Sequence, residues 1–228
     1  MKMKRSEKLG MFTGLVVGVL LLLISVFMIF QTTCKVWGAE KPANATQQGI
    51  DVSSHQGKID WEQVKNSALA DYAIIRCGYG VNQTDKDDKY WDYNSSECER
   101  LGIPYGTYLY SGADTTAKAK SEAEHVVRLL QGKNLTYPIY YDMEADMLNQ
   151  LSSTQIGNIA KTFLNTMESY GYKNVAVYSN KYLFETKLTA SVFSDYPKWI
   201  AQHSNKCTYQ GSYHMWQYST QGVIPGIS

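Results

Sequence analysis

The sequence predicts an α/β fold built on a mainly parallel sheet, and three observations support this prediction. Short apolar runs alternate with helical segments over most of the chain, a rhythm typical of βαβ units. Near the C-terminus, two strand-like runs follow each other with too few residues between them for a full crossover helix, so this part is expected to be rich in β-structure. The strand-like runs number seven, one fewer than a closed eight-stranded barrel needs.

The strand predictions rest on short runs of β-branched, aromatic and other apolar residues bounded by polar or glycine-containing segments. In chain order they cover residues 49–52, 72–76, 104–110, 137–142, 175–178, 198–201 and 213–218.

The helix predictions rest on capping residues and on apolar spacing. Asp60 can cap a helix that follows it, and Gln63, three residues later, completes the pattern of a capping box. Two further helices are expected over residues 91–101 and 115–130, each followed by a glycine. A fourth helix ends at a glycine too, and its buried face is predicted to comprise Ile156, Ile159, Ala160, Phe163, Leu164 and Met167.

Four segments are expected along the chain. Residues 1–10 are basic, and residues 11–30 form an apolar run that would span about 30 Å as a helix, the thickness of a bilayer core. The basic flank predicts a cytoplasmic tail, a single transmembrane helix or uncleaved signal anchor, and an extracellular body. A cleaved signal peptide, which would make the body secreted, is the alternative. Residues 31–48 read as a linker, and residues 49–228 as one domain.

Charge and cysteine usage exclude two classes of function. Residues 1–9 carry four basic residues and one acidic residue, whereas the rest of the chain has 18 basic and 20 acidic residues. A slightly acidic body without a basic stripe gives no support for nucleic-acid binding. The four cysteines form no C-x-x-C pair, so the spacing of a zinc site is absent. A disulfide between Cys77 and Cys98 and a pair of free thiols both remain open.

Two carboxylates, Asp142 and Glu144, follow the fourth predicted strand. Residues i and i+2 of a strand face the same side, so the two groups should point into one space roughly 7 Å apart along the chain. If Glu144 is the less solvated of the two, their mutual repulsion would keep it protonated near neutral pH. A solvated acidic loop is the alternative with no function.

Polar and aromatic residues also gather at the C-terminal ends of the other predicted strands, where barrels of this kind build active sites. They include Asp51, His55, Tyr79, Tyr108, Tyr110, Tyr178, Trp199, His203, Trp216 and Gln217. Aromatic faces with carboxylates suit carbohydrate, and two carboxylates suit cleavage of a glycosidic bond. A divalent-metal site formed by Asp51, Asp142 and Glu144, with His55, is the competing chemistry.

Several motifs resemble those of the glycoside hydrolase family 25 lysozymes. The most specific are residues 49–61, GIDVSSHQGKIDW, and residues 141–144, YDME. Supporting matches in the order of the family are IIRCGYG at 74–80, YLYS at 108–111, WIA at 199–201 and WQYS at 216–219. The resemblance covers about residues 48–228.

The resemblance implies a modified TIM-like β/α barrel whose last strands lack full helices. It implies hydrolysis of the β-1,4 bond between N-acetylmuramic acid and N-acetylglucosamine in peptidoglycan, without a metal or other cofactor. Carried over by position, Glu144 is the general acid, Asp142 stabilises a substrate-assisted intermediate, and Asp51 is a further active-site carboxylate. Residues implied or expected to contact the sugars are Tyr79, Tyr108, Tyr110, Tyr178, Trp199, Trp216 and Gln217.

Two departures from the family pattern lead to further expectations. His203 stands where the family commonly has an aromatic residue. The family continues into a last strand with an Asp-x-Asn motif, and this sequence stops at Ser228, so an open strand edge is expected. The leading hypothesis is a membrane-anchored muramidase that cuts peptidoglycan glycan strands locally, for remodelling or for passage of a cell-envelope machine. A weakly active wall-binding or scaffold protein is the alternative.

Overall fold

The computed structural model describes residues 44–227. The predicted tail, the apolar run at 11–30 and most of the linker lie outside the described residues. No helix within residues 44–227 is long and apolar enough to cross a bilayer.

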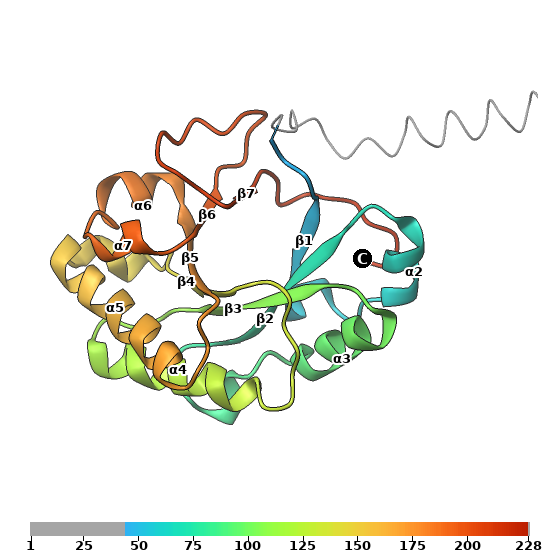
Figure 1. Ribbon diagram of the computed structural model, residues 1–228, viewed down its shortest axis with the longest axis horizontal. Coiled ribbons are helices and arrows are strands. Elements are labelled where there is room, and N and C mark those ends of the chain that lie inside the picture. Colours follow the sequence, from blue (N-terminus) through green and yellow to red (C-terminus); the bar gives the residue numbers. More distant parts are fainter. Residues whose placement is uncertain (1–43, 228) are drawn as a thin grey trace, which may run out of the picture. The chain divides into compact units, whose positions relative to one another are not determined.

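The described chain folds around one seven-stranded sheet whose strands all run parallel and lie in the order of the sequence. The strands are β1 (Gly49–Val52), β2 (Tyr72–Tyr79), β3 (Tyr105–Tyr110), β4 (Ile139–Asp142), β5 (Val175–Asn180), β6 (Lys198–Ala201) and β7 (Met215–Gln217). The sheet curls into part of a barrel, and helices cover its outer side (Figure 1). The predicted parallel α/β architecture is confirmed, and each predicted strand has a counterpart.

One helix follows each of the first four strands, and two short helices follow the fifth. They are α2 (Trp61–Ser67), α3 (Trp91–Leu101), α4 (Thr116–Leu129), α5 (Ser153–Ser169), α6 (Lys181–Thr186) and α7 (Val192–Asp195), with 3-10 turns at Ser54–Gln56, Thr84–Lys86 and Asp146–Gln150. No helix separates β6 from β7, as their short connection predicts. The short helices α6 and α7 were not predicted.

Capping explains where two of these helices begin. The Asp60 carboxylate accepts a hydrogen bond of 3.1 Å from the Gln63 backbone N–H at the start of α2. The Gln63 side chain donates to the same carboxylate at 2.8 Å, so the cap is confirmed although its return bond goes to the side chain. A capping box that was not predicted, between Ser152 and Gln155, starts α5.

Alternation along the strands separates two apolar clusters. In β4, Ile139 and Tyr141 face the helices and join the larger cluster, where the Tyr141 ring stacks on Phe163 of α5 with centroids 3.8 Å apart. Tyr140 faces the inside of the curl, in a smaller cluster that includes Trp199. The inner face therefore carries aromatic residues up to the C-terminal ends of the strands, and this positions the site described below.

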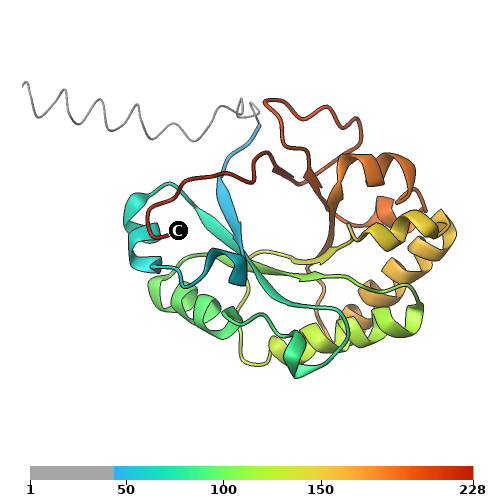
Figure 2. The ribbon, with the colours of Figure 1, turned by 180° about the vertical axis from the view of Figure 1, so that it is seen from behind.

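Within the described chain, β1 and β7 are the two edges of the sheet. Side chains link them: Gln217 Nε2 donates to Asp51 Oδ1 at 3.0 Å, and Gln48 Nε2 donates to the Tyr218 hydroxyl at 2.9 Å. The segment after β7 then crosses to α2 (Figures 1 and 2), where the Gly226 carbonyl accepts from the Asp60 N–H at 2.9 Å.

The three cysteines in the described region are free thiols. Cys77 and Cys98 are both buried, and burial raises the pKa of the Cys77 thiol to about 12. The disulfide that the sequence left open is therefore not formed, and these two residues serve as packing groups.

Candidate active site

A cavity of about 210 Å³ opens among the C-terminal ends of the inner strands. Three carboxylates, three aromatic side chains and three other polar residues line it: Asp51, Tyr108, Asp142, Glu144, Tyr178, Trp199, His203, Gln217 and Thr220. Seven of these nine residues were predicted as site residues from the sequence.

Strand alternation explains why these side chains meet. Met143 is fully buried in the cluster beneath the helices, so its neighbours Asp142 and Glu144 turn to the inside of the curl. The expectation that both carboxylates enter one space is confirmed by the cavity that they share. Asp142 pairs in register with Tyr110 of β3 and with Tyr178 of β5.

Asp142 is the most enclosed carboxylate of the site. It is 3% exposed, and its Oδ1 is buried with no hydrogen-bond partner within residues 44–227. Burial, followed by the nearby Glu144 and Asp51 carboxylates, holds the pKa of Asp142 well above its ordinary value, and Arg76 only partly opposes them. The Arg76 guanidinium is engaged with Asp88 at 2.8 Å, and no ion pair in the described part of the chain includes Asp142.

Burial also raises the pKa of Glu144 and of Asp51, in each case as the largest effect. Glu144 is partly exposed, and a nearby His203 opposes the rise when it is charged. The premise that Glu144 is less solvated than Asp142 is therefore wrong. Asp142 is the more enclosed of the two, and its burial raises its pKa.

The raised pKa values make the stability of this fold depend on pH in a defined direction. The folded state holds the Asp142 proton more tightly than the unfolded chain, so the free energy of unfolding falls as pH rises from the ordinary range of an aspartate to the raised one. Asp142→Asn is expected to increase the melting temperature at pH 7 by at least about 2 °C, equivalent to about 1 kcal/mol. Near pH 3 the gain in melting temperature should be smaller, because Asp142 of the wild type is then largely protonated in the unfolded chain as well as in the folded one.

Thermal unfolding of the wild-type chain and of Asp142→Asn, at pH 3 and pH 7, measures this difference. An equal shift at both pH values, or a decrease at pH 7, would show that Asp142 is not held in its neutral form.

Gln217 connects the two sides of the cavity. Its Oε1 accepts from the Tyr178 hydroxyl at 2.9 Å and lies 2.9 Å from His203 Nε2, and its Nε2 donates to Asp51 at 3.0 Å. The Tyr178 hydroxyl also lies near Glu144 and opposes the rise of its pKa. One amide therefore joins β5, β6 and β7 to the carboxylate of β1.

Three predicted sugar-contacting residues lie outside the lining of this cavity. Tyr79 and Tyr110 are 38% and 36% exposed at the ends of β2 and β3, and a bulge between Arg76 and Gly78 shifts the register just before Tyr79. Trp216 lines a different hollow. Their roles stay predictions.

Sequence reasoning left two lining residues out of the predicted site. The strand-end rule did select His203, which follows β6 by two residues, but no catalytic or sugar-binding role was predicted for it. Thr220 lies in the irregular segment after β7, where no periodic pattern predicts the direction of a side chain.

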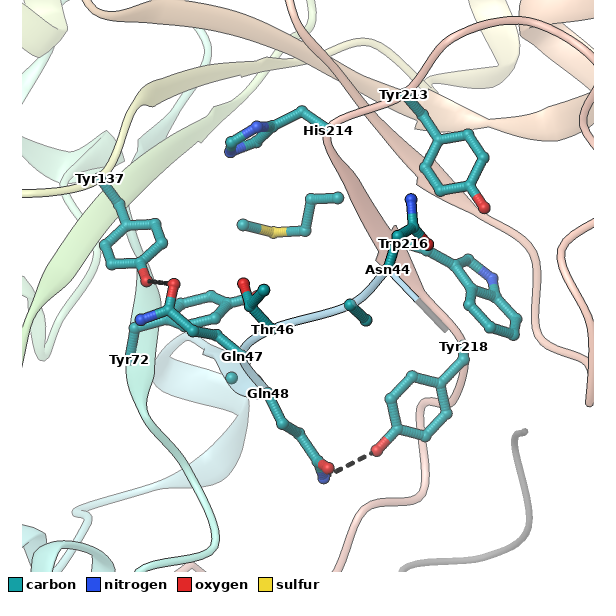
Figure 3. A pocket seen from close by; sticks show the side chains of 13 residues that line it. Asn44, Thr46, Gln47, Gln48, Tyr72, Tyr137, Tyr213, His214, Trp216 and Tyr218 are labelled. Atoms are coloured by element: carbon teal, nitrogen blue, oxygen red, sulfur yellow. Dashed lines mark hydrogen bonds between the residues drawn. The ribbon is translucent and has the colours of Figure 1, made fainter. Parts of the chain in front are cut away.

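The second hollow, of about 270 Å³, lies at the opposite end of the strands, around the first residues of β1, β2 and β7. Figure 3 shows its aromatic and amide side chains, two of them joined to tyrosines by hydrogen bonds: Gln47 to Tyr137 at 2.6 Å and Gln48 to Tyr218 at 2.9 Å. None of the residues that line it is a carboxylate. It therefore lacks the pair of carboxylates that cleavage of a glycosidic bond needs, and the smaller cavity is the candidate active site.

The metal hypothesis requires a group of ligands close together. In residues 44–227, no group of three or more His, Cys, Asp or Glu side chains is arranged to hold a metal ion. His55 lies in the 3-10 turn after β1 and is not part of the cavity lining.

Comparison with known proteins identifies the fold that carries this cavity. Residues 50–227 match the family Glycosyl hydrolases family 25. The chain belongs to this family. The match spans all seven strands and every residue of the cavity lining, so the resemblance based on the motifs is confirmed at the level of the family.

Individual relatives agree with the family 25 assignment. The chain is 30% identical to the autolytic lysozyme of Clostridium acetobutylicum over 182 residues, which are 79% of this chain and 53% of that protein. The crystal structure of the modular autolysin LytC from Streptococcus pneumoniae superposes with a TM-score of 0.72 at 34% identity, over 79% of this chain and 44% of LytC. A family 25 glycosyl hydrolase from Bacillus anthracis shares the fold, with a TM-score of 0.72 at 20% identity over 83% of this chain and 86% of that one.

The family 25 domain is thus shared with larger proteins. The chain spans about half the length of the autolytic lysozyme and less than half of LytC. The chain therefore corresponds to one part of each of these two proteins.

Proposed function

We propose that this domain hydrolyses the β-1,4 bond between N-acetylmuramic acid and N-acetylglucosamine in peptidoglycan. Membership of glycosyl hydrolases family 25 and the similarity to an autolytic lysozyme support this activity. LytC, to which the chain is 33% identical, has been crystallised with a synthetic peptidoglycan ligand. Peptidoglycan glycan strands are accordingly the proposed partner.

The observation that carries the proposal is the unpartnered Asp142 Oδ1. A buried carboxylate oxygen without a donor is unfavourable, and it gains free energy when a ligand supplies an N–H group. The acetamido group of an N-acetyl sugar carries such a donor beside the carbon that reacts. Asp142 therefore fits the role of orienting that acetamido group and of balancing the positive charge that develops on it.

Binding of the sugar would also redistribute the proton in the cavity. A hydrogen bond from the acetamido N–H favours the ionised form of Asp142 and lowers its raised pKa. The partly exposed Glu144, whose own pKa is raised, then becomes the group that keeps a proton. Binding of the glycan would thus favour a proton on Glu144 over one on Asp142.

The proposed reaction has two steps. In the first step, Glu144 protonates the glycosidic oxygen as its bond to C1 breaks, and the acetamido oxygen forms a new bond to C1. The product is an oxazolinium ion whose N–H is hydrogen-bonded to the Asp142 carboxylate. Water then attacks C1, the ionised Glu144 accepts its proton, and the acetamido oxygen leaves. Both displacements invert C1, so the configuration is retained overall.

The remaining lining residues bind and orient the glycan in this account. Trp199, 3% exposed and packed edge-on against Tyr108 and Tyr140, offers a rigid apolar wall for a sugar ring. Gln217 holds Asp51 by a hydrogen bond, and it also fixes the Tyr178 hydroxyl near Glu144. Asp51 would tune the charge of the site rather than react.

The proposed setting is the outer face of the cytoplasmic membrane. The apolar run at residues 11–30 and the basic residues before it support a single-pass anchor with the domain outside. There the domain would cut peptidoglycan locally, for remodelling or for passage of a cell-envelope machine.

Inhibition by a stable thiazoline analogue of the oxazolinium ion tests the proposed course. The full chain is expected to release soluble sugars from purified peptidoglycan, to be inhibited competitively by the thiazoline, and to be unaffected by a chelator. Activity that the thiazoline leaves unchanged would contradict substrate assistance. Loss of activity on chelation, restored by a divalent cation, would instead support a metal-dependent hydrolase.

A further inference from the structure

One buried carboxylate takes no part in the cavity. Glu122 of α4 is 0% exposed, yet its two oxygens accept three hydrogen bonds. Oε1 accepts from the Gly112 N–H at 2.8 Å, and Oε2 accepts from the Ser111 hydroxyl at 2.9 Å and from the Tyr141 hydroxyl at 2.6 Å. Burial raises the pKa of Glu122, and these hydrogen bonds oppose the rise.

The three donors come from the ends of the two strands beside the catalytic pair. Tyr141 directly precedes Asp142 in β4, and Ser111 and Gly112 directly follow β3. The Ser111 N–H also donates to the Asp142 carbonyl oxygen at 2.9 Å. One side chain of α4 therefore fixes the C-terminal ends of β3 and β4 where the chain leaves the sheet toward Glu144.

Burying a carboxylate at a core position costs free energy of desolvation. An apolar side chain of similar volume would avoid the desolvation of a carboxylate and is often as stable or more so. The carboxylate provides positional specificity that an apolar side chain lacks, because its two oxygens fix three hydrogen-bond donors from two segments at defined distances. That precision matters most where neighbouring groups must be placed for chemistry.

We infer that Glu122 is a positioning residue for the Asp142–Glu144 pair. The inference rests on the proposed function. Of the lining residues expected to contact the sugars, Tyr178, Trp199 and Gln217 lie on β5, β6 and β7 and make none of the Glu122 contacts, and Tyr108 alone lies on β3. Loss of Glu122 should therefore reduce kcat much more than it raises KM.

Four variants of the full chain test this role. Glu122→Leu removes all three hydrogen bonds. Glu122→Gln keeps the shape of the side chain: its oxygen can still accept from the Gly112 N–H, and its NH₂ group can donate to the hydroxyls of Ser111 and Tyr141. Tyr141→Phe removes one hydroxyl while its ring can stay stacked on Phe163, so it remains informative if Glu122→Leu fails to fold. Glu124→Gln is the matched control, because Glu124 lies on the same helix, is partly exposed and contacts Lys120.

Steady-state kinetics on a soluble glycan fragment, at a temperature where circular dichroism shows each variant folded, give the first readout. Glu122→Leu is expected to lower kcat by about 100-fold with KM changed less than threefold, Tyr141→Phe to lower kcat by a smaller factor, and Glu122→Gln to recover at least tenfold over Leu. Glu124→Gln should match the wild type. Folded Glu122→Leu or Tyr141→Phe with wild-type kcat would overturn the inference.

A substrate-free readout separates this inference from the proposed function. Carbon-13 NMR of the side-chain carboxyls follows the titration of Asp142 in the wild type, in Tyr141→Phe and in Glu124→Gln. A displaced midpoint in Tyr141→Phe alone supports positioning by Glu122, even if the wild-type chain cleaves no glycan and the proposed function fails. Identical titrations in all three proteins would overturn it.

Discussion

Glu144→Gln is expected to reduce the rate of peptidoglycan hydrolysis by about 10³-fold or more, because the amide cannot donate the proton that the leaving oxygen needs. Glu144 is partly exposed in the cavity, so the exchange of one oxygen for an NH₂ group should leave the fold intact. The rate of release of reducing sugars from purified cell walls measures the effect.

Asp146→Asn is the matched control for this variant. Asp146 lies two residues further along the same segment, is exposed and does not line the cavity, so its loss should change the rate by less than about twofold. A Glu144→Gln protein that clears cell walls at the wild-type rate would remove Glu144 from the role of general acid.

Asp142→Asn is expected to lower kcat by about 10²–10³-fold, the usual cost of removing one group that stabilises transition-state charge. An asparagine cannot balance the charge of an oxazolinium ion, although it can still accept from the acetamido N–H. The loss should come mainly in kcat, with KM for the glycan little changed. Combined with the gain in melting temperature at pH 7 described above, this variant should be more stable and less active.

The thiazoline analogue gives an independent measure of the same contact. Its binding should weaken in Asp142→Asn more than binding of the uncleaved glycan does, because only the analogue resembles the charged intermediate. Equal weakening for both ligands would mean that Asp142 binds substrate without stabilising the intermediate.

Much of the fold was predictable because it depends on local periodicity. Alternation in the run that ends at Asp142 predicts which side chains face the helices, and the buried Met143 confirms it for Glu144. The strand-end rule likewise brought together residues as distant in sequence as Asp51 and Gln217, which are hydrogen-bonded in the structure.

The order of burial within the site was not predictable from the sequence. Asp142 and Glu144 are alike in charge and spacing, and only the tertiary environment encloses the first and leaves the second partly open. Trp199 and Trp216 were likewise both selected by the strand-end rule. Trp199 lines the candidate active site, but Trp216 lines the hollow at the other end of the strands. In each case the decisive property is packing against segments distant in sequence.

Glu122 shows the same limit for residues outside the cavity. It lies in the middle of α4 among Lys, Ser and Glu residues, a composition typical of a solvated helix face. Its burial follows from the approach of Tyr141 and Ser111, two segments whose positions depend on the whole sheet.

The sugar at the newly formed reducing end tests the central proposal most directly. Purified peptidoglycan is digested with the full chain, the products are reduced with borohydride, and mass spectrometry identifies the reduced sugar. The proposed cleavage predicts N-acetylmuramitol in the wild-type digest and its absence in the Glu144→Gln digest. Reduced N-acetylglucosamine at the new ends, or no new reducing ends from the wild-type chain, would contradict the proposal.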